Sequence, residues 1–523
     1  MAIMLAFLRT HGFIALLVQL LFSLPLYGQE NPKWHLQDPE LDGVMGIGAE
    51  RAFRFLEGRV PDTVIVAIMD NGADLNHEDL KGTFWVNPDE IPGNGVDDDG
   101  NGYVDDIHGW NFLGSRDGRN LKMETTGLTR CYARYSKLFG DREEGDVEPT
   151  LVDEYRLYQK IRVEYEAEVA RKQKIITGYN NLLRIYLRNE AFGQEEVEQI
   201  KEASEEVLQT RKFFMDMYSY KLDQKAIEAT LSDTKRDLAT RLNPEFQNRE
   251  EIVGDDPDNL CDTIYGNALL NVRGPYHGTG VASIVGALHN ESDVDGIAPM
   301  VKLMILRIGP NGDERDKDIA LAIRYAVNKG AKIINLSFGK KYGCHPEFVE
   351  QVLEEVKSKD VLIVHGSGNS AVDTDNIPFH PMGTLPGGER SSNWMNVGAS
   401  CKLDDPKLAA FFSNYGSQSV DIFAPGVEIP SCGLNNSYSK SSGTSAAAPV
   451  VSGIAAVLKA YYPFLTGAQL KNVIMRSAFI PSTPEVEVPG SKGETTAPFS
   501  ELSVSGGIAN LYRAVMLVEK EFD

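Results

Sequence analysis

The chain is predicted to fold as a doubly wound, mostly parallel α/β sheet with helices on both faces, carrying a large α-helical insertion. Three observations support this prediction. Short apolar runs alternate with amphipathic helical patterns from Val60 onward. The apolar runs are nearly continuous, which is typical of parallel strands buried on both faces. A long, charged, helix-forming block interrupts the alternation, and 523 residues leave room for one large domain plus an insertion.

The individual elements follow from these patterns. Apolar runs predict strands in "TVIVAIMD" (63–70), "VKLMILRI" (301–308), "AKIINLSFG" (331–339) and "VLIVHGSGN" (361–369). Helical periodicity predicts helices at 278–289, 316–330 and 346–359, between the strands. Together they form an α/β domain that we expect to comprise residues 29–120 and 250–523.

Residues 121–249 are the predicted insertion. From Leu151 to Leu242 there is no proline and there are only two glycines, so two or three long helices are expected. Four residues within the block fall near helical spacing and indicate a packed seam rather than a cofactor site: Tyr155, Tyr158, Ile161 and Tyr165. A lid, an arm that docks a partner and a stabilising appendage all remain open as its role.

The N-terminus resembles an export signal. Arg9 and His11 precede the apolar run 12–24, and the small residue Gly28 follows a few positions later. The run is short for a membrane span. We therefore expect a signal peptide over residues 1–28, no stable membrane anchor, and a periplasmic or extracellular location.

The net charge and the cysteine spacing bear on which partners, metal sites and disulfides the protein can have. The net charge of −23 argues against nucleic acid as a partner. The five cysteines are far apart and lack metal-type pairing such as C-x-x-C. An exported protein can hold one or two disulfides, but the sequence does not assign them.

Polar residues end three of the predicted strands. Asp70, Ser337 and Asn369 should meet at one edge of the sheet, since that is where parallel strands end. Each is also a favoured turn residue. His277 and Ser445 stand where small-residue helices begin, and Ser445 alone could be a helix cap. Together, however, Asp, His and Ser have the composition of an orienting acid, a base and a nucleophile.

Five segments then carry a family resemblance. "VIVAIMDNGADLNHEDL", "HGTGVASIVG", "INLSFG", "GSGN" and "SSGTSAAAPVVSG" resemble, in order, the signatures of the subtilisin-like serine proteases. The resemblance covers about 60–120 and 250–515. It implies the subtilisin-like fold and a serine endopeptidase that hydrolyses peptide or protein substrates through an acyl-enzyme.

The resemblance also implies roles for particular residues. Asp70 would orient the imidazole, His277 would act as base and then acid, and Ser445 would attack. Asn369, with the Ser445 backbone N–H, would form the oxyanion hole. Two segments would bind substrate, one along its backbone and one beside the residue before the cleaved bond: Ser337, Phe338 and Gly339, and Gly366, Ser367 and Gly368.

The sequence departs from the family pattern at several positions. Asn71 replaces a Ser or Thr, Gly280 a second His, Ser283 a Gly, and Gly366-Ser367 an Ala-Ala pair. Asp70 and His277 are also unusually far apart in sequence. The stretch from Gln29 to Val60 is short for a folding-assisting propeptide, so either folding proceeds without one or the insertion limits activity.

The segment "GNGVDDDGNGYVDDIHGW" (93–110) is a candidate metal loop. Asp97, Asp99, Asn101 and Gly102 fit the pattern D-x-[DN]-x-[DN]-G, and Asp105 and Asp106 extend the oxygen supply. His108 occupies the twelfth position instead of Glu, which argues against a true EF-hand. The alternative is a solvated acidic turn. We expect structural calcium, held near the active site, with Asp97, Asp99, Asn101 and Asp105 as ligands, and no catalytic cofactor.

Parts of the sequence are also compatible with two other function classes. An inactive family member could use the cleft or the helical insertion to bind another protein, although binding alone would not require Asp70, His277, Asn369 and Ser445 together. A calcium-dependent adhesive protein would rest on the acidic loop alone, and the chain lacks the tandem repeats that such proteins often have.

Overall fold

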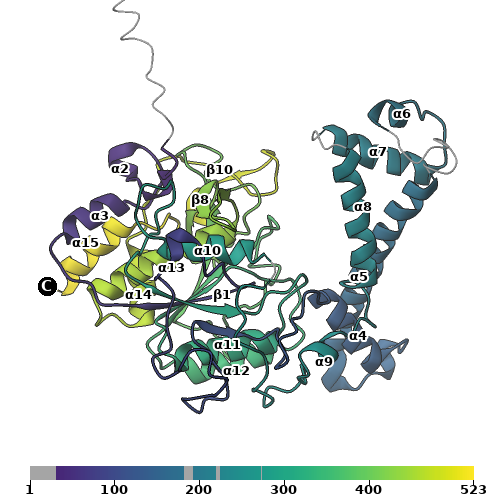
Figure 1. Cartoon of the computed structure of the whole chain (residues 1–523). Helices are drawn as coiled ribbons and strands as arrows, with labels where there is room; N and C mark the ends of the chain where they lie inside the picture. Colours follow the sequence, from purple (N-terminus) through teal and green to yellow (C-terminus); the bar gives the residue numbers. More distant parts are fainter. Residues whose placement is uncertain (1–30, 182–192, 220–223, 273, 523) are drawn as a thin grey trace, which may run out of the picture.

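The computed structural model describes residues 31–181, 193–219, 224–272 and 274–522. The expected signal peptide, residues 1–28, lies outside the described residues. The chain forms a rounded α/β body and a helical arm beside it (Figure 1). The arm is built from the helices between Gly127 and Ala239.

A seven-stranded sheet runs through the centre of the body. Its order is β2 (Gly109–Asn111), β3 (Lys302–Arg307), β1 (Ile65–Asp70), β4 (Ile333–Leu336), β5 (Leu362–Gly366), β6 (Trp394–Ser400) and β7 (Ile422–Pro425). All six neighbouring pairs are parallel. The four strands predicted from apolar runs are present, and β2, β6 and β7 are additional.

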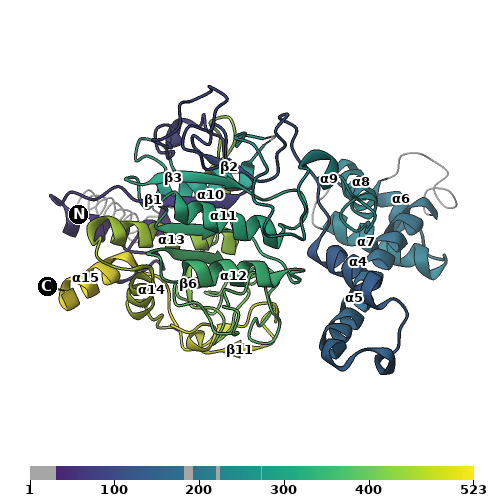
Figure 2. The same ribbon diagram turned by 90° about the horizontal axis from the view of Figure 1, so that it is seen from below.

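Helices cover both faces of this sheet (Figure 2). In β1, Val66 and Ile68 pack into one apolar core while Ala67 and Met69 pack into the other. The first core also holds α3 (Ala49–Leu56), α10 (Tyr276–Gly286), α13 (Thr444–Tyr461), α14 (Gly467–Arg476) and α15 (Leu511–Phe522). The second holds α11 (Asp316–Asn328) and α12 (Pro346–Val356). A sheet covered on both faces explains why its strands are apolar throughout.

Smaller elements complete the body. Two antiparallel pairs are β8 (Ile429–Cys432) with β9 (Tyr438–Ser441), and β10 (Val486–Glu487) with β11 (Thr496–Ala497). Short helices are α2 (Pro39–Asp42) and α9 (Arg249–Ile252). Single 3₁₀ turns lie at Trp34–Leu36, Glu78–Leu80, Glu144–Asp146, Pro149–Leu151 and Phe499–Glu501. In the described part of the chain, α13 is the helix long and apolar enough to cross a membrane, and 89% of that segment is buried in the core.

The arm consists of α4 (Gly127–Phe139), α5 (Val152–Asn181), α6 (Gln194–Glu198), α7 (Glu205–Ser219) and α8 (Gln224–Ala239). It has small apolar cores of its own. Tyr155, Tyr158, Ile161 and Tyr165 are buried, and Tyr165 stacks on Tyr132 of α4 with ring centroids 4.1 Å apart. The seam predicted from helical spacing is therefore a packing surface.

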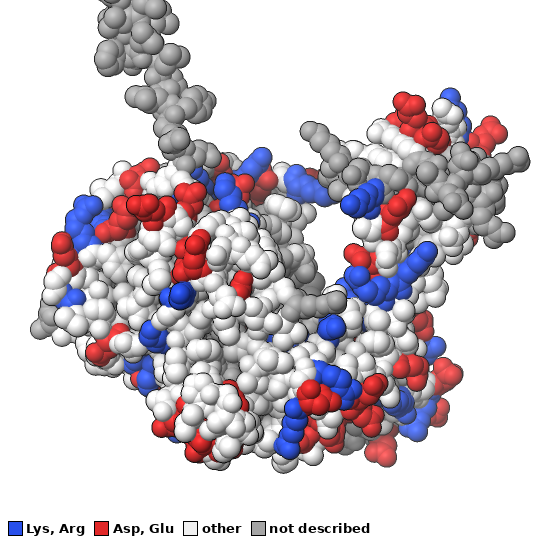
Figure 3. All heavy atoms as spheres, viewed as in Figure 1, with Lys and Arg blue, Asp and Glu red and all other residues white. Residues whose placement is uncertain are grey.

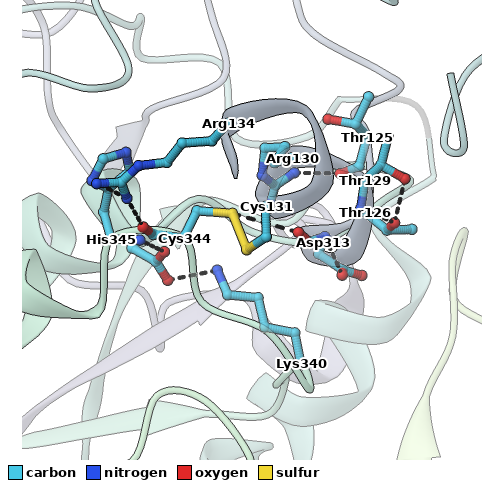
Figure 4. Close-up of a disulfide and its surroundings, with 12 residues drawn as sticks. Thr125, Thr126, Thr129, Arg130, Cys131, Arg134, Asp313, Lys340, Cys344 and His345 are labelled. Carbon is cyan, nitrogen blue, oxygen red and sulfur yellow. Dashed lines mark hydrogen bonds and ion pairs between the residues drawn. A yellow bond between two sulfur atoms is a disulfide. The ribbon is translucent and has the colours of Figure 1, made fainter. Parts of the chain in front are cut away.

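The base of the arm is fastened to the body by α4 (Figure 4). A disulfide joins Cys131 of α4 to Cys344, just before α12, with Cα atoms 5.2 Å apart. The backbone N–H of Gly127 donates to Asp313 at 2.7 Å, and Arg130 donates to the Glu314 carbonyl at 2.9 Å. The arm is thus hydrogen-bonded to the loop that connects β3 to α11.

Candidate active site

The predicted site residues gather at the carboxyl edge of the sheet. Asp70 is the last residue of β1, and Ser337 directly follows β4. Asn369 lies three residues beyond β5. His277 and Ser445 are the second residues of α10 and α13, so both stand inside the first turn rather than before it. Ligands in doubly wound sheets bind at this edge.

Asp70 and His277 form a direct pair. His277 Nδ1 lies 2.9 and 2.8 Å from the two carboxylate oxygens of Asp70. The Asp70 side chain is only 5% exposed, whereas that of His277 is 45% exposed. The negative charge of Asp70 raises the pKa of His277, and this effect and the hydrogen bond outweigh the opposing effect of burial. The buried carboxylate thus fixes the imidazole and favours its protonated form.

Gly278 allows α10 to begin against the end of β1. A Cβ atom there would lie 2.0 Å from the Gly72 carbonyl oxygen and 3.1 Å from Asp70 Cβ. The backbone N–H of Gly278 donates to Asn71 Oδ1 at 3.1 Å. Asn71, which departs from the family pattern, therefore links the loop after Asp70 to the helix that carries His277.

The backbone around Ser445 is shaped by its neighbours in α13. Pro449 lacks an N–H and cannot donate to the Ser445 carbonyl four residues earlier. Ser337 Oγ donates to that carbonyl oxygen instead, at 3.0 Å. The Ser445 carbonyl, left without a donor inside the helix, is therefore satisfied by the side chain that directly follows β4.

A buried chain of hydrogen bonds supports Ser337. Asn335 Nδ2 donates to Ser337 Oγ at 2.9 Å, and Ser452 Oγ donates to Asn335 Oδ1 at 2.8 Å. Asn335 and Ser452 are fully buried. Ser452 lies two turns beyond Ser445 in α13, so this series of hydrogen bonds begins and ends on the same helix. It fixes the first turn of α13 against β4.

Asn369 has a defined orientation. Its Oδ1 accepts hydrogen bonds from the Thr444 N–H at 2.8 Å and from Thr444 Oγ1 at 3.2 Å. The Nδ2 group is thereby turned toward Gly443: a Cβ atom placed there would lie 3.4 Å from Asn369 Nδ2 and 2.9 Å from Ser445 Oγ. The amide donor and the serine hydroxyl therefore border the same small space, which glycine leaves open.

One contact expected of a nucleophile and its base is absent. Among the residues that the structure describes, no hydrogen bond joins His277 Nε2 to Ser445 Oγ. Catalytic hydrogen bonds are often long before substrate binds. As a residue of the first turn of α13, Ser445 also has a backbone N–H without an acceptor inside the helix.

The two predicted substrate-binding segments follow neighbouring strands: residues 337–339 come directly after β4, and residues 366–368 lie at the end of β5. Ser337 and Ser367 direct their hydroxyls into the protein, toward the Ser445 carbonyl and the Asn414 carbonyl at 3.0 and 3.2 Å. Phe338 is half-buried and packs against the core that holds α11 and α12. Gly339, Gly366 and Gly368 add no side chain. At this edge of the sheet the two segments thus consist mostly of peptide backbone.

Glu314 is an acidic neighbour that sequence reasoning missed. Burial, together with the negative charges of Asp313 and Asp70, raises its pKa to about 7. Its charge also contributes to raising the pKa of His277. The residue lies in the loop between β3 and α11, where no motif marks it.

The acidic loop lies elsewhere. Residues 93–106 precede β2 and contact the end of α11, where Lys329 pairs with Asp99 and with Asp106, the latter at 3.6 Å. That is the amino edge of the sheet, so the expectation that this loop lies near the active site is wrong. The physical reason is that the segment leads into the start of a parallel strand and not out of its end.

The predicted ligands within this loop are engaged in hydrogen bonds with the loop itself and with Asp106. Asp97 accepts from the Asn101 and Gly102 N–H groups, at 3.1 and 2.7 Å, and Asp105 accepts from the Gly93 N–H at 2.7 Å. Asn101 donates to Asp106 at 3.0 Å. The carboxylates that gather within 4.8 Å of one another are those of Glu90, Asp99 and Asp106. Burial and the charges of Asp106 and Asp99 raise the pKa of Glu90.

Known proteins are similar to this chain in sequence. The model of the subtilase family matches residues 62–505. Alkaline elastase YaB from Bacillus sp. (strain YaB) is 35% identical over 203 residues, which are 39% of this chain and 50% of the relative. Subtilisin Savinase from Lederbergia lenta is 34% identical over 203 residues, 39% of this chain and 70% of the relative. The chain spans about half the length of several of the curated relatives that it matches.

Solved structures also resemble part of this chain. The patellamide maturation protease PatA is 29% identical with a TM-score of 0.37, covering 47% of this chain and 84% of that one. The prenylagaramide maturation protease PagA is 28% identical with a TM-score of 0.38, covering 46% and 82%. The family match includes Asp70, His277, Asn369 and Ser445 and extends across the arm. The chain therefore belongs to the subtilase family.

Proposed function

We propose that this protein is a serine endopeptidase in which Ser445 attacks a peptide carbonyl. His277 takes the Ser445 hydroxyl proton as the Oγ–C bond forms, and passes it to the leaving amine as the C–N bond breaks. Water then attacks the acyl-enzyme with the same base, and the returning proton restores Ser445. Asp70 holds Nδ1 of His277 and stabilises the imidazolium. The observation that carries this proposal is the Asp70–His277 pair at 2.8 Å at the edge where α13 presents Ser445.

Two groups are candidates to donate hydrogen bonds to the carbonyl oxygen as negative charge develops on it. Asn369 Nδ2 is aimed by the two hydrogen bonds from Thr444, and the Ser445 N–H is free at the start of α13. Preorganised donors of this kind stabilise the tetrahedral intermediate more than the planar substrate. The site thus supports acyl transfer with no catalytic cofactor.

The substrate is an extended peptide or protein segment. The backbone walls 337–339 and 366–368 supply N–H and C=O groups with which an extended chain can pair. Nucleic acid is disfavoured by the net charge of −23. On the face shown in Figure 3, Lys and Arg side chains are interspersed with Asp and Glu rather than gathered into a basic patch.

Three further features belong to this proposal. Residues 1–28 direct export to the periplasm or the medium. The cluster of Glu90, Asp99 and Asp106, with the loop 93–106, binds structural calcium. The arm either covers the cleft or docks a protein partner, and its attachment to the loop 313–314 supports a link to the site.

The first test is covalent labelling by a fluorophosphonate, which reacts with activated serines. The proposal predicts that the mature protein is labelled and that Ser445→Ala is not. Circular dichroism on both proteins establishes that they are folded. A folded wild-type protein that remains unlabelled, with and without calcium, would favour the alternative that the chain is an inactive subtilase that binds another protein.

A further inference from the structure

The side chain of Phe379 lies between the two backbone segments 337–339 and 366–368. A Cβ atom built on Gly339 would lie 2.1 Å from Phe379 Cε1, and one built on Gly368 would lie 2.6 Å from Phe379 Cζ. The same ring edge therefore touches both backbones, one beyond β4 and one beyond β5. Gly339 and Gly368 leave space here, and the phenyl ring fills it.

The ring is held in this place by its own segment. His380, the next residue, exchanges two backbone hydrogen bonds with Lys340, at 2.7 and 2.9 Å. Lys340 is buried and pairs with Asp316 at 2.7 Å. On its other side the ring stacks on His365, with centroids 6.0 Å apart. Phe379 is thus fixed beside Gly339 by backbone pairing.

The position of the Phe379 ring matters because the substrate residue before the cleaved bond must place its side chain there. The carbonyl carbon under attack lies at Ser445 Oγ and its oxygen near Asn369 Nδ2, while the leaving amine must face His277. The side chain of the residue before the cleaved bond is attached one atom from that carbonyl. In the proposed function it enters between the two substrate-binding segments, 337–339 and 366–368, on the side away from His277.

The ring also borders a cavity of about 200 Å³. The other residues that line this cavity include His365, Ser367, Thr374, Asp375 and Ser419. The ring therefore lies between the two glycines on one side of its contacts and a space large enough for a substantial side chain. Removing the ring would enlarge that space toward Gly339 and Gly368.

We propose that Phe379 restricts this endopeptidase to substrates with a small residue, such as Ala or Gly, before the cleaved bond. The inference rests on the proposed function of Ser445. A large aromatic residue before the cleaved bond would have to displace a ring that two backbone segments and His365 hold in place. The cost of that displacement appears as a lower kcat/KM for the large substrate.

The test compares two peptide substrates that differ only in Ala or Phe before the cleaved bond. We expect the wild-type protein to cleave the Ala peptide with a kcat/KM about tenfold or more above that of the Phe peptide. In Phe379→Ala this ratio should fall about tenfold or invert. The control Phe411→Ala removes a ring that is 79% exposed and lies outside the cleft, and should leave the ratio unchanged.

A second measurement tests peptide binding independently of peptide-bond cleavage. Calorimetry on Ser445→Ala protein compares binding of peptides that end in Ala or Phe, with no bond cleaved. Tighter binding of the Ala peptide, reversed when Phe379→Ala is added, supports the inference even if fluorophosphonate labelling fails. Equal binding or equal cleavage of the two peptides by protein that retains Phe379 overturns it, and that result needs no Phe379 variant.

Discussion

The hydroxyl of Ser337 donates a hydrogen bond to the carbonyl oxygen of Ser445, 3.0 Å away. This bond replaces the helical one that Pro449 cannot make, and it joins the end of β4 to the first turn of α13. Because the partner of Ser337 is the backbone of the proposed nucleophile, the bond positions Ser445 without touching the reacting atoms.

Replacing Ser337 by Ala should therefore lower activity by a modest amount. One neutral hydrogen bond is worth about 1 kcal/mol, so kcat/KM should fall about fivefold, mainly in kcat. Steady-state kinetics on a peptide substrate measures the effect. In a Pro449→Ala background the new N–H can donate to the Ser445 carbonyl, and the cost of Ser337→Ala should shrink. An equal loss in both backgrounds would contradict this role for Ser337.

The pH dependence should report the Asp70–His277 pair. Asp70 raises the pKa of His277 above 6.5, and the base must be neutral to accept the serine proton. Activity should therefore rise with pH through a midpoint above 6.5. Asp70→Asn removes the charge, so that midpoint should move to lower pH while kcat falls by about 10⁴-fold. The pH profile of kcat/KM for both proteins measures this.

Glu314→Gln is the matched variant for that measurement. It also removes a negative charge that raises the pKa of His277, but its influence is weaker than that of Asp70. The midpoint should move in the same direction by a smaller amount, with activity largely kept. A midpoint that stays fixed in both variants would exclude His277 as the titrating base.

The disulfide between the arm and the body should stabilise the fold. Cys131 and Cys344 are 213 residues apart in sequence, and a bridge that closes a long loop restricts the unfolded chain. Changing both to Ser should lower the free energy of unfolding by about 2–4 kcal/mol. Urea unfolding followed by circular dichroism gives the value. Cys261→Ser, which alters an exposed free cysteine, is the control. Two free thiols at 131 and 344 in the untreated protein would contradict the pairing.

Calcium should raise thermal stability and leave the chemistry unchanged. The acidic loop lies at the amino edge of the sheet, and the proposed active site lies at the carboxyl edge. Added calcium should raise the Tm of the wild-type protein and have much less effect on Asp106→Asn, since one buried carboxylate is lost. Asp153→Asn, at a side chain 99% exposed, serves as control. An unchanged Tm in the wild type would rule out a calcium site here.

The central fold could be predicted because its signals are local. Continuous apolar runs such as 63–70 and 361–369 are buried on both faces and cannot be mistaken for surface segments. The strand β2, only Gly109–Asn111, escaped because three residues carry no periodicity. Strands β6 and β7 contain polar or small residues among the apolar ones, as in "WMNVGAS" and "IFAP".

The candidate site was predictable only in part. Asp70, His277, Asn369 and Ser445 stand in motifs, and parallel topology brings the ends of their elements together. Phe379 and Glu314 stand in no motif, and their importance comes from long-range contacts that link loops far apart in sequence. The acidic loop was misplaced for the opposite reason: its composition is clear, but composition does not tell at which end of a strand a loop lies.

The position of the disulfide determines what happens to the protein when a protease cuts the arm. The arm lies between Asp70 and His277 in sequence, so a single cut between Gly140 and Ala239 would divide the chain into one fragment with the acid and another with the base and the nucleophile. Cys131 belongs to the first fragment and Cys344 to the second. A nicked molecule would therefore remain one covalent unit in an oxidising medium, and in a denaturing gel it would separate into two pieces only after reduction.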